Sequence, residues 1–133
     1  MTGYVNKMCE RFRAGSGVDL SKKTETPYIA DQAWSDPADG EGRYARIASS
    51  HAASSLFLCR VGRPDLSAAT QRLCAKVSAW TEVHDKALVK LMLFASSTAE
   101  RTLSGSLAPA DLSEVELHCY SDADLNGNLR LVG

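Results

Sequence analysis

Oxygen-bearing side chains alternate near the C-terminus in a pattern that suits a divalent cation. Asp122, Asp124 and Asn126 are followed by Gly127. Oxygen ligands at positions 1, 3 and 5 with glycine at position 6 are typical of a calcium loop. In a second interpretation, Asp122 ends a β-strand and its carboxylate helps to hold a metal ion against a phosphodiester. A third interpretation is a plain β-turn stabilised by the Asx side chains, with no chemistry.

The flanking residues disfavour a calcium loop. Position 12, which should be a bidentate glutamate, is Gly133. From Val115 to Tyr120 apolar and polar residues alternate, which is the period of a half-buried strand and not of the helix that enters a calcium loop. The sequence therefore favours Asp122, with Asp124 beside it, as a metal ligand within a larger acidic site.

Composition limits the classes of protein to which the chain can belong. It has 133 residues, 44% of them hydrophobic, which is enough to bury a core. The formal net charge is −1, so a nucleic-acid contact would be local. No apolar run approaches a membrane span and the N-terminus lacks a signal-peptide core, so we expect an intracellular protein with no membrane partner. Because no C-x-x-C pair occurs, we expect reduced thiols at Cys9, Cys59, Cys74 and Cys119.

We expect a mainly α-helical fold with a small β-element. Helical spacing of apolar residues predicts helices over residues 4–13, 43–59 and 64 to about 78, and one that begins after Thr81. Short strands are predicted over residues 103–107 and 115–121. These elements divide the chain into an N-terminal helix (1–17), an extended connector (18–42), a three- to four-helix bundle (43–98) and the start of a sheet (99–133).

Aromatic residues and histidines have structural interpretations. Tyr28 and Ile29 are expected to pin the connector to the core, together with Trp34. Trp34 and Trp80 are interpreted as packing anchors. His84 is expected in the first turn of a helix, where its side chain diverges from that of its neighbour Asp85, so the two form no acid–base pair.

Blocks of sequence then occur in a recognisable order. They are Glu10-Arg11-Phe12, Thr26-Pro27, Arg63-Pro64-Asp65-Leu66, Trp80-Thr81-Glu82-Val83-His84 and Tyr120-Ser121-Asp122-Ala123-Asp124. In content and spacing this series resembles the C-terminal part of the reverse transcriptase of copia-type LTR retrotransposons and its junction with ribonuclease H. The resemblance covers nearly the whole chain.

The resemblance implies a fold and a set of partners. In that family the helices form the polymerase thumb and connection, which lie against the template-primer duplex, and the closing strand begins an incomplete ribonuclease H-like sheet. The partners would be the rest of the Pol polyprotein and a template-primer or RNA–DNA hybrid. Asp122 would be catalytic only within a complete ribonuclease H, with Mg²⁺ in the intact parent and none bound tightly here. The predicted phosphate contacts, which could instead merely solvate the bundle, are Arg63, Arg72, Lys76, Lys86 and Lys90.

The chain lacks catalytic motifs of the resembled family and differs from its pattern at several residues. The polymerase Tyr-x-Asp-Asp would lie before residue 1 and further nuclease carboxylates after Gly133, so we expect no catalysis by this chain alone. Residues 93–98 lack the family's basic helix ending, and Asp85 replaces an aromatic residue, which suggests a divergent or decayed copy. The alternatives are a small helical protein-interaction module and a calcium-responsive loop protein that uses residues 122–127.

Overall fold

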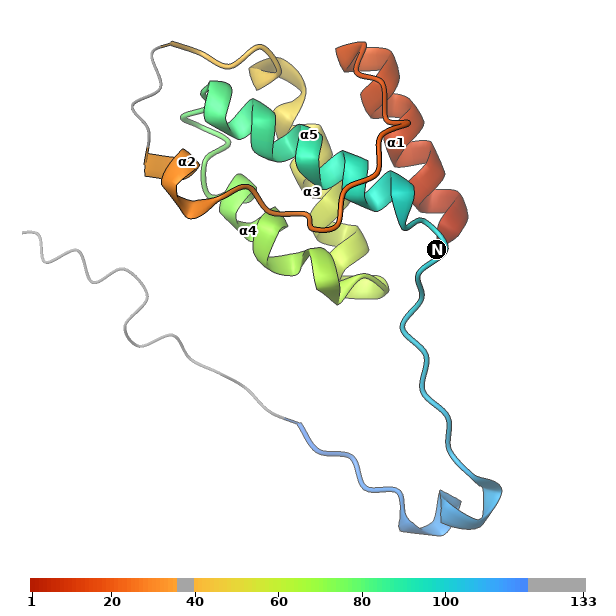
Figure 1. Cartoon of the computed structure of the whole chain (residues 1–133). Helices are drawn as coiled ribbons and strands as arrows, with labels where there is room; N and C mark the ends of the chain where they lie inside the picture. The colour runs from red at the N-terminus through yellow and green to blue at the C-terminus, as the bar shows by residue number, and fades with distance from the viewer. Residues whose placement is uncertain (36–39, 120–133) are drawn as a thin grey trace, which may run out of the picture. The chain divides into compact units, whose positions relative to one another are not determined.

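The computed structural model describes residues 1–35 and 40–119 (Figure 1). The chain forms two compact units, Met1–Leu103 and Ser104–Gly133. Helices build the first unit, which confirms the mainly helical fold class predicted from the sequence. None of the helices in the described ranges is long and apolar enough to cross a membrane.

The first helix, α1, spans Thr2–Ser16. It buries Val5, Met8 and Phe12, whose spacing of three or four residues places them on one face. Gly17 ends the helix in the left-handed conformation at φ 72°, where its N–H donates to the carbonyl of Arg13. Because other residues are strained at this φ, glycine accounts for the stop. The helix predicted over residues 4–13 is present and is longer at both ends.

Residues 18–42 contain a short helix that the sequence did not predict. This helix, α2, spans Asp31–Ser35. It forms where Asp31 pairs with Arg72 on α4, a long-range contact that spacing within the connector cannot indicate. Trp34 packs partly buried against the core, whereas Tyr28 is 41% exposed and does not serve as the predicted anchor. Leu20, which is almost fully buried, anchors the connector to the core together with Trp34 and the partly buried Ile29.

The next elements are a helix close to the one predicted over residues 43–59, a 3₁₀ turn and a short helix. They are α3 (Ala45–Val61), the 3₁₀ turn η1 (Pro64–Leu66) and α4 (Ser67–Cys74). The single helix expected from residue 64 to about 78 is therefore wrong in its extent. Beyond α4 the N–H of Lys76 bonds to the carbonyl of Leu73 and that of Ala79 to Lys76, both at 3.0 Å. Bonding three residues back tightens the chain into turns and ends the α-helix.

The last long helix, α5, spans Glu82–Ser97 and begins after Thr81, as predicted. Nδ1 of His84 accepts the N–H of Thr81 at 2.9 Å and so satisfies a backbone donor at the start of the helix. α5 packs against α1 and α4, and α3 packs against the same two helices (Figure 1). The shared core includes Phe12, Leu58, Leu73 and Leu88, each at most 1% exposed.

The small β-element is absent from the described part of the second unit and its approach. Residues 103–107 and 115–119 form no strand, and the only regular element there is the 3₁₀ helix η2, Pro109–Glu114. Leu103 is 76% exposed and Leu117 is 90% exposed. Alternating residues form a strand only when another strand takes up their backbone hydrogen bonds, and no described residue does so.

Candidate nucleic-acid interface

The predicted phosphate contacts lie in three separate places. Arg63 is buried, at 1% exposed. Arg72 and Lys76 line a hollow beside α4, whereas Lys86 and Lys90 line a groove along α5. The structure therefore brings these cations together as two pairs and does not form one continuous basic track.

Arg63 is bonded entirely within the chain. Its Nε and Nη2 donate to the two carboxylate oxygens of Asp65, each at 2.8 Å, and Nη1 donates to the carbonyl of Thr98 at 2.9 Å. The guanidinium lies 6.0 Å from the ring centroid of Phe94. The hydrogen bond from Arg63 holds the pKa of the Asp65 carboxyl below its usual value. This corrects the predicted role of Arg63: its buried guanidinium ties η1 to the end of α5 and is not accessible to a phosphate.

We call the space beside α4 the α4 hollow. Its volume is about 390 Å³, and it is lined by Trp34, Arg72, Ala75, Lys76, Ala79 and His84. The guanidinium of Arg72 lies 4.8 Å from the ring centroid of Trp34, and its Nη1 pairs with Oδ1 of Asp31 at 2.8 Å. Lys76 is exposed and forms no ion pair with any described residue. The hollow thus combines two cations with an aromatic wall.

His84 lies between two indoles at this hollow. Its ring centroid is 5.5 Å from that of Trp34 and 5.4 Å from that of Trp80. Because Nδ1 accepts the Thr81 N–H, the neutral ring carries its proton on Nε2. Burial and then the charge of Lys76 lower the pKa of His84 below its usual value. The imidazole is therefore held as a neutral hydrogen-bond donor.

The indole N–H of Trp34 is buried and has no acceptor among the described residues. An unsatisfied buried donor costs about 1–3 kcal/mol, so such groups call for an explanation. Its neighbours at the hollow are alanines and other donors. Because this atom is itself buried, a ligand in the hollow would meet the ring of Trp34 and not its N–H.

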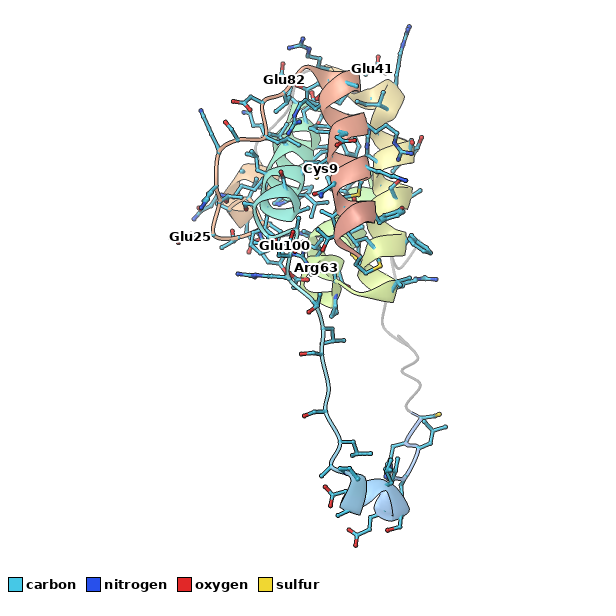
Figure 2. All side chains as sticks on the ribbon, turned by 90° about the vertical axis from the view of Figure 1, so that its right-hand side faces the viewer. Cys9, Glu25, Glu41, Arg63, Glu82 and Glu100 are labelled. Carbon is cyan, nitrogen blue, oxygen red and sulfur yellow. The ribbon has the colours of Figure 1, made fainter. Side chains whose placement is uncertain are left out.

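We call the second space the α5 groove. Its volume is about 560 Å³, and it is lined by Glu41, Arg43, Tyr44, Glu82, Asp85, Lys86, Val89, Lys90 and Leu93. Tyr44, Val89 and Leu93 supply apolar surface. Glu41 and Glu82 lie at one end of the bundle, away from Arg63 at the other (Figure 2). The groove is therefore apolar in part and carries charges of both signs.

Asp85 forms part of the wall of this groove. Its carboxylate accepts the indole N–H of Trp80 at 2.7 Å and the backbone N–H groups of Arg43 and Tyr44 at 2.6 and 3.0 Å. It thereby ties the start of α3 to α5. His84 lines the α4 hollow while Asp85 lines the α5 groove, which confirms that the two side chains diverge.

The acidic residues proposed as metal ligands, Asp122 and Asp124, lie outside the described residues. Within residues 1–35 and 40–119, no group of three or more His, Cys, Asp or Glu side chains is placed to hold a metal ion. The described cysteines are free thiols. Burial raises the pKa of the Cys9 thiol to about 11, so it stays protonated near neutral pH.

Comparison with known protein families, with curated proteins and with solved structures gave no match for this chain.

The sequence did not predict that Trp34 and His84 lie beside the cations of the α4 hollow. Trp34 and His84 were interpreted only as a packing anchor and a helix residue, yet they line the α4 hollow with Arg72 and Lys76. Their separation along the chain hides the cluster. The spacing of Lys86, Val89, Lys90 and Leu93, which recur at three or four residues along one helix, was a usable signal for the α5 groove.

Proposed function

We propose that this chain is a piece of a copia-type retrotransposon Pol polyprotein, running from the thumb and connection of the reverse transcriptase into the start of ribonuclease H. In the intact protein its bundle would lie against a template-primer or an RNA–DNA hybrid. Asp122, with Asp124 beside it, would contribute to a Mg²⁺ site whose other carboxylates come from elsewhere in the parent. The order of the sequence blocks supports this assignment.

One observation carries the proposed contact with nucleic acid. Arg72 on α4 and Lys76 in the turn after α4 line the same hollow. Lys86 and Lys90 on α5 are four residues apart, so they lie on one helix face. α5 begins within the Trp80–His84 block of the resemblance, and α4 follows directly on the Arg63–Leu66 block. Lysine and arginine on exposed helix faces are the usual partners of backbone phosphates.

The chain alone is proposed to catalyse neither DNA synthesis nor RNA cleavage. Phosphoryl transfer by two metals needs several convergent carboxylates to hold the ions, and this sequence contains no Tyr-x-Asp-Asp. Primer extension and hybrid cleavage assays with Mg²⁺ or Mn²⁺ test this. Activity of the purified chain in either assay would contradict it, and hybrid cleavage that is lost in an Asp122→Asn variant would assign the cleavage to this chain.

Binding to an RNA–DNA hybrid tests the contact itself. We expect weak binding, with a dissociation constant of roughly 10–100 μM at low salt, that weakens as salt rises. Replacing Lys86 and Lys90 together by Gln should lower the slope of log affinity against log salt by about 1.5, because each lost phosphate contact contributes about 0.7–0.9. Lys22→Gln with Lys23→Gln, the same charge change in the exposed connector, is the matched control. Equal slopes for both double variants would contradict the proposed contact.

A second candidate function is a protein-interaction module without a nucleic-acid role. The apolar lining of the α5 groove by Tyr44, Val89 and Leu93 favours it. The wild-type chain would then bind no RNA–DNA hybrid, and Leu93→Glu would abolish binding of a protein partner in pull-down experiments. The calcium interpretation of residues 122–127 stays a prediction, which a spectral change at millimolar Ca²⁺ would support.

A further inference from the structure

The polar side-chain groups that line the α4 hollow are all hydrogen-bond donors. Arg72 and Lys76 are cations, and Trp34 offers only an indole N–H. His84 is neutral, with Nδ1 already occupied by Thr81, so Nε2–H is the group it can offer. The remaining lining residues, Ala75 and Ala79, have no polar side-chain atom. The donors of Arg72, Lys76 and His84, with no acceptor side chain in the lining, match an oxyanion ligand.

The size of the hollow indicates a ligand larger than a lone phosphate. Its volume of about 390 Å³ falls within the range of small-molecule sites, which combine an apolar wall with a few polar groups. The methyl groups of Ala75 and Ala79 and the indole of Trp34 form such a wall. A ligand with a phosphate and an apolar or aromatic body would use both parts.

We propose that the α4 hollow binds a nucleotide unit. Arg72 and Lys76 neutralise its phosphate, His84 donates a hydrogen bond from Nε2, and the sugar or base lies against Ala75 and Trp34. The phosphate can come from a free nucleotide or from the end of a polynucleotide, since the recognising chemistry is the same.

Asp31 is the acidic group that competes with this ligand. Its carboxylate pairs with Nη1 of Arg72 at 2.8 Å, but its side chain is 87% exposed. An exposed pair of this kind is weak, so a phosphate can replace the carboxylate. Removing the competitor by Asp31→Asn should therefore tighten nucleotide binding.

The test is titration of the full chain with AMP, inorganic phosphate and adenosine, followed by calorimetry and by tryptophan fluorescence. We expect AMP to bind at least threefold more tightly than phosphate and adenosine not to bind. Arg72→Gln and Lys76→Gln should each weaken AMP binding about tenfold, the loss expected for a charge-assisted hydrogen bond. Asp31→Asn should strengthen it at least twofold. Trp34→Ala, which removes the aromatic wall, should weaken it.

Matched controls separate a specific site from general attraction of anions. Lys22→Gln removes one positive charge from the exposed connector, as Lys76→Gln does from the hollow, and should leave AMP affinity within twofold of wild type. The proposal is overturned if AMP and phosphate both fail to bind, if they bind equally well, or if this control weakens AMP binding as much as Lys76→Gln does. Preference for a 5′-phosphorylated over an unphosphorylated short oligonucleotide would support the site and place the phosphate at a chain end.

The inference deepens the proposed function, because it places a nucleotide subsite on the proposed nucleic-acid surface. The two can nevertheless fail separately. If the Lys86 and Lys90 double variant loses hybrid binding but wild type binds no AMP, only the nucleotide site in the α4 hollow is contradicted. If wild type binds AMP through Lys76 but binds no hybrid, only the proposed contact with nucleic acid is contradicted.

Discussion

At the scale of single residues, Asp85 decides how two helices meet. The residue is 8% exposed, and its carboxylate accepts hydrogen bonds from Trp80, Arg43 and Tyr44. In the resembled family an aromatic residue stands here, so the sequence alone left a packing contact at this position in doubt. A charged side chain is instead tolerated because three donors converge on it. Nothing within residues 80–88 could reveal the backbone donors some forty residues earlier.

Replacing Asp85 by Ala should lower the free energy of unfolding by about 2–4 kcal/mol, because an indole N–H and two backbone N–H groups lose their acceptor. Urea denaturation followed by circular dichroism measures the change. Glu10→Ala, an exposed site on α1, should stay within about 0.5 kcal/mol of wild type. A similar loss in the two variants would show that the Asp85 contacts contribute nothing specific.

Acidification should destabilise the fold through His51. Burial, and then the charge of Arg11, lower the pKa of this histidine below its ordinary 6.5, and its Nδ1 has no hydrogen-bond partner among the described residues. The unfolded chain therefore takes up a proton more readily than the folded one. The stability this confers is complete above pH 6.5 and is lost as the pH falls through the lowered pKa.

The pH prediction is measured by urea unfolding at intervals between pH 7.5 and about 5. His51→Leu should make the decline in unfolding free energy shallower, because one titrating group has been removed. His84, whose pKa is also lowered, should leave part of the decline in place. An equally steep decline in the variant would contradict a role for His51.

At the scale of elements, local signals predicted starts better than ends. Thr81 and Glu82 marked the beginning of α5 correctly, because capping is decided within one turn. The end of α4 at Cys74 was missed, because apolar spacing continues to Val77 while the backbone changes to hydrogen bonds that reach back three residues. The two strands were predicted but are absent from the described residues, because alternation is visible in one segment whereas a strand needs a partner.

Glycine substitutions test how the connector meets α5. A Cβ atom on Gly42 would lie 2.5 Å from the carbonyl oxygen of Thr81, so Gly42→Ala must push backbone apart and should cost about 1–3 kcal/mol. Gly3, on α1, has nothing within 4 Å, so Gly3→Ala should be neutral or stabilise by up to about 1 kcal/mol. Thermal unfolding compares the two, and the same sign for both would contradict the close approach at Gly42.

At the scale of the whole molecule, the mainly helical fold was predictable and the arrangement of its cations was not. Apolar spacing identifies α1, α3 and α5 because each buries one face. The α4 hollow unites residues from α2, α4, the following turn and α5, and the burial of Arg63 depends on Thr98. Such groupings arise from packing between distant segments, so helical spacing alone could not give them.

The buried hydrophobic residues of the described chain run from Val5 to Ala95, within the unit Met1–Leu103. A chain of residues 1–103 should therefore unfold cooperatively, with a melting temperature within about 5 °C of the full chain. Phe12→Ala in that shorter chain should cost about 3–5 kcal/mol, since Phe12 is fully buried. A non-cooperative transition in the shorter chain would contradict a self-sufficient core.

We propose that this chain is a piece of a copia-type Pol polyprotein, and the sharpest test is to sequence the genomic DNA on both sides of its coding region and translate it. We expect an open or decayed reading frame with Tyr-x-Asp-Asp roughly one domain upstream of residue 1. We also expect further acidic strand ends downstream of Gly133, in phase with Asp122. Flanking sequence that carries unrelated genes, with neither motif in any frame, would contradict the claim.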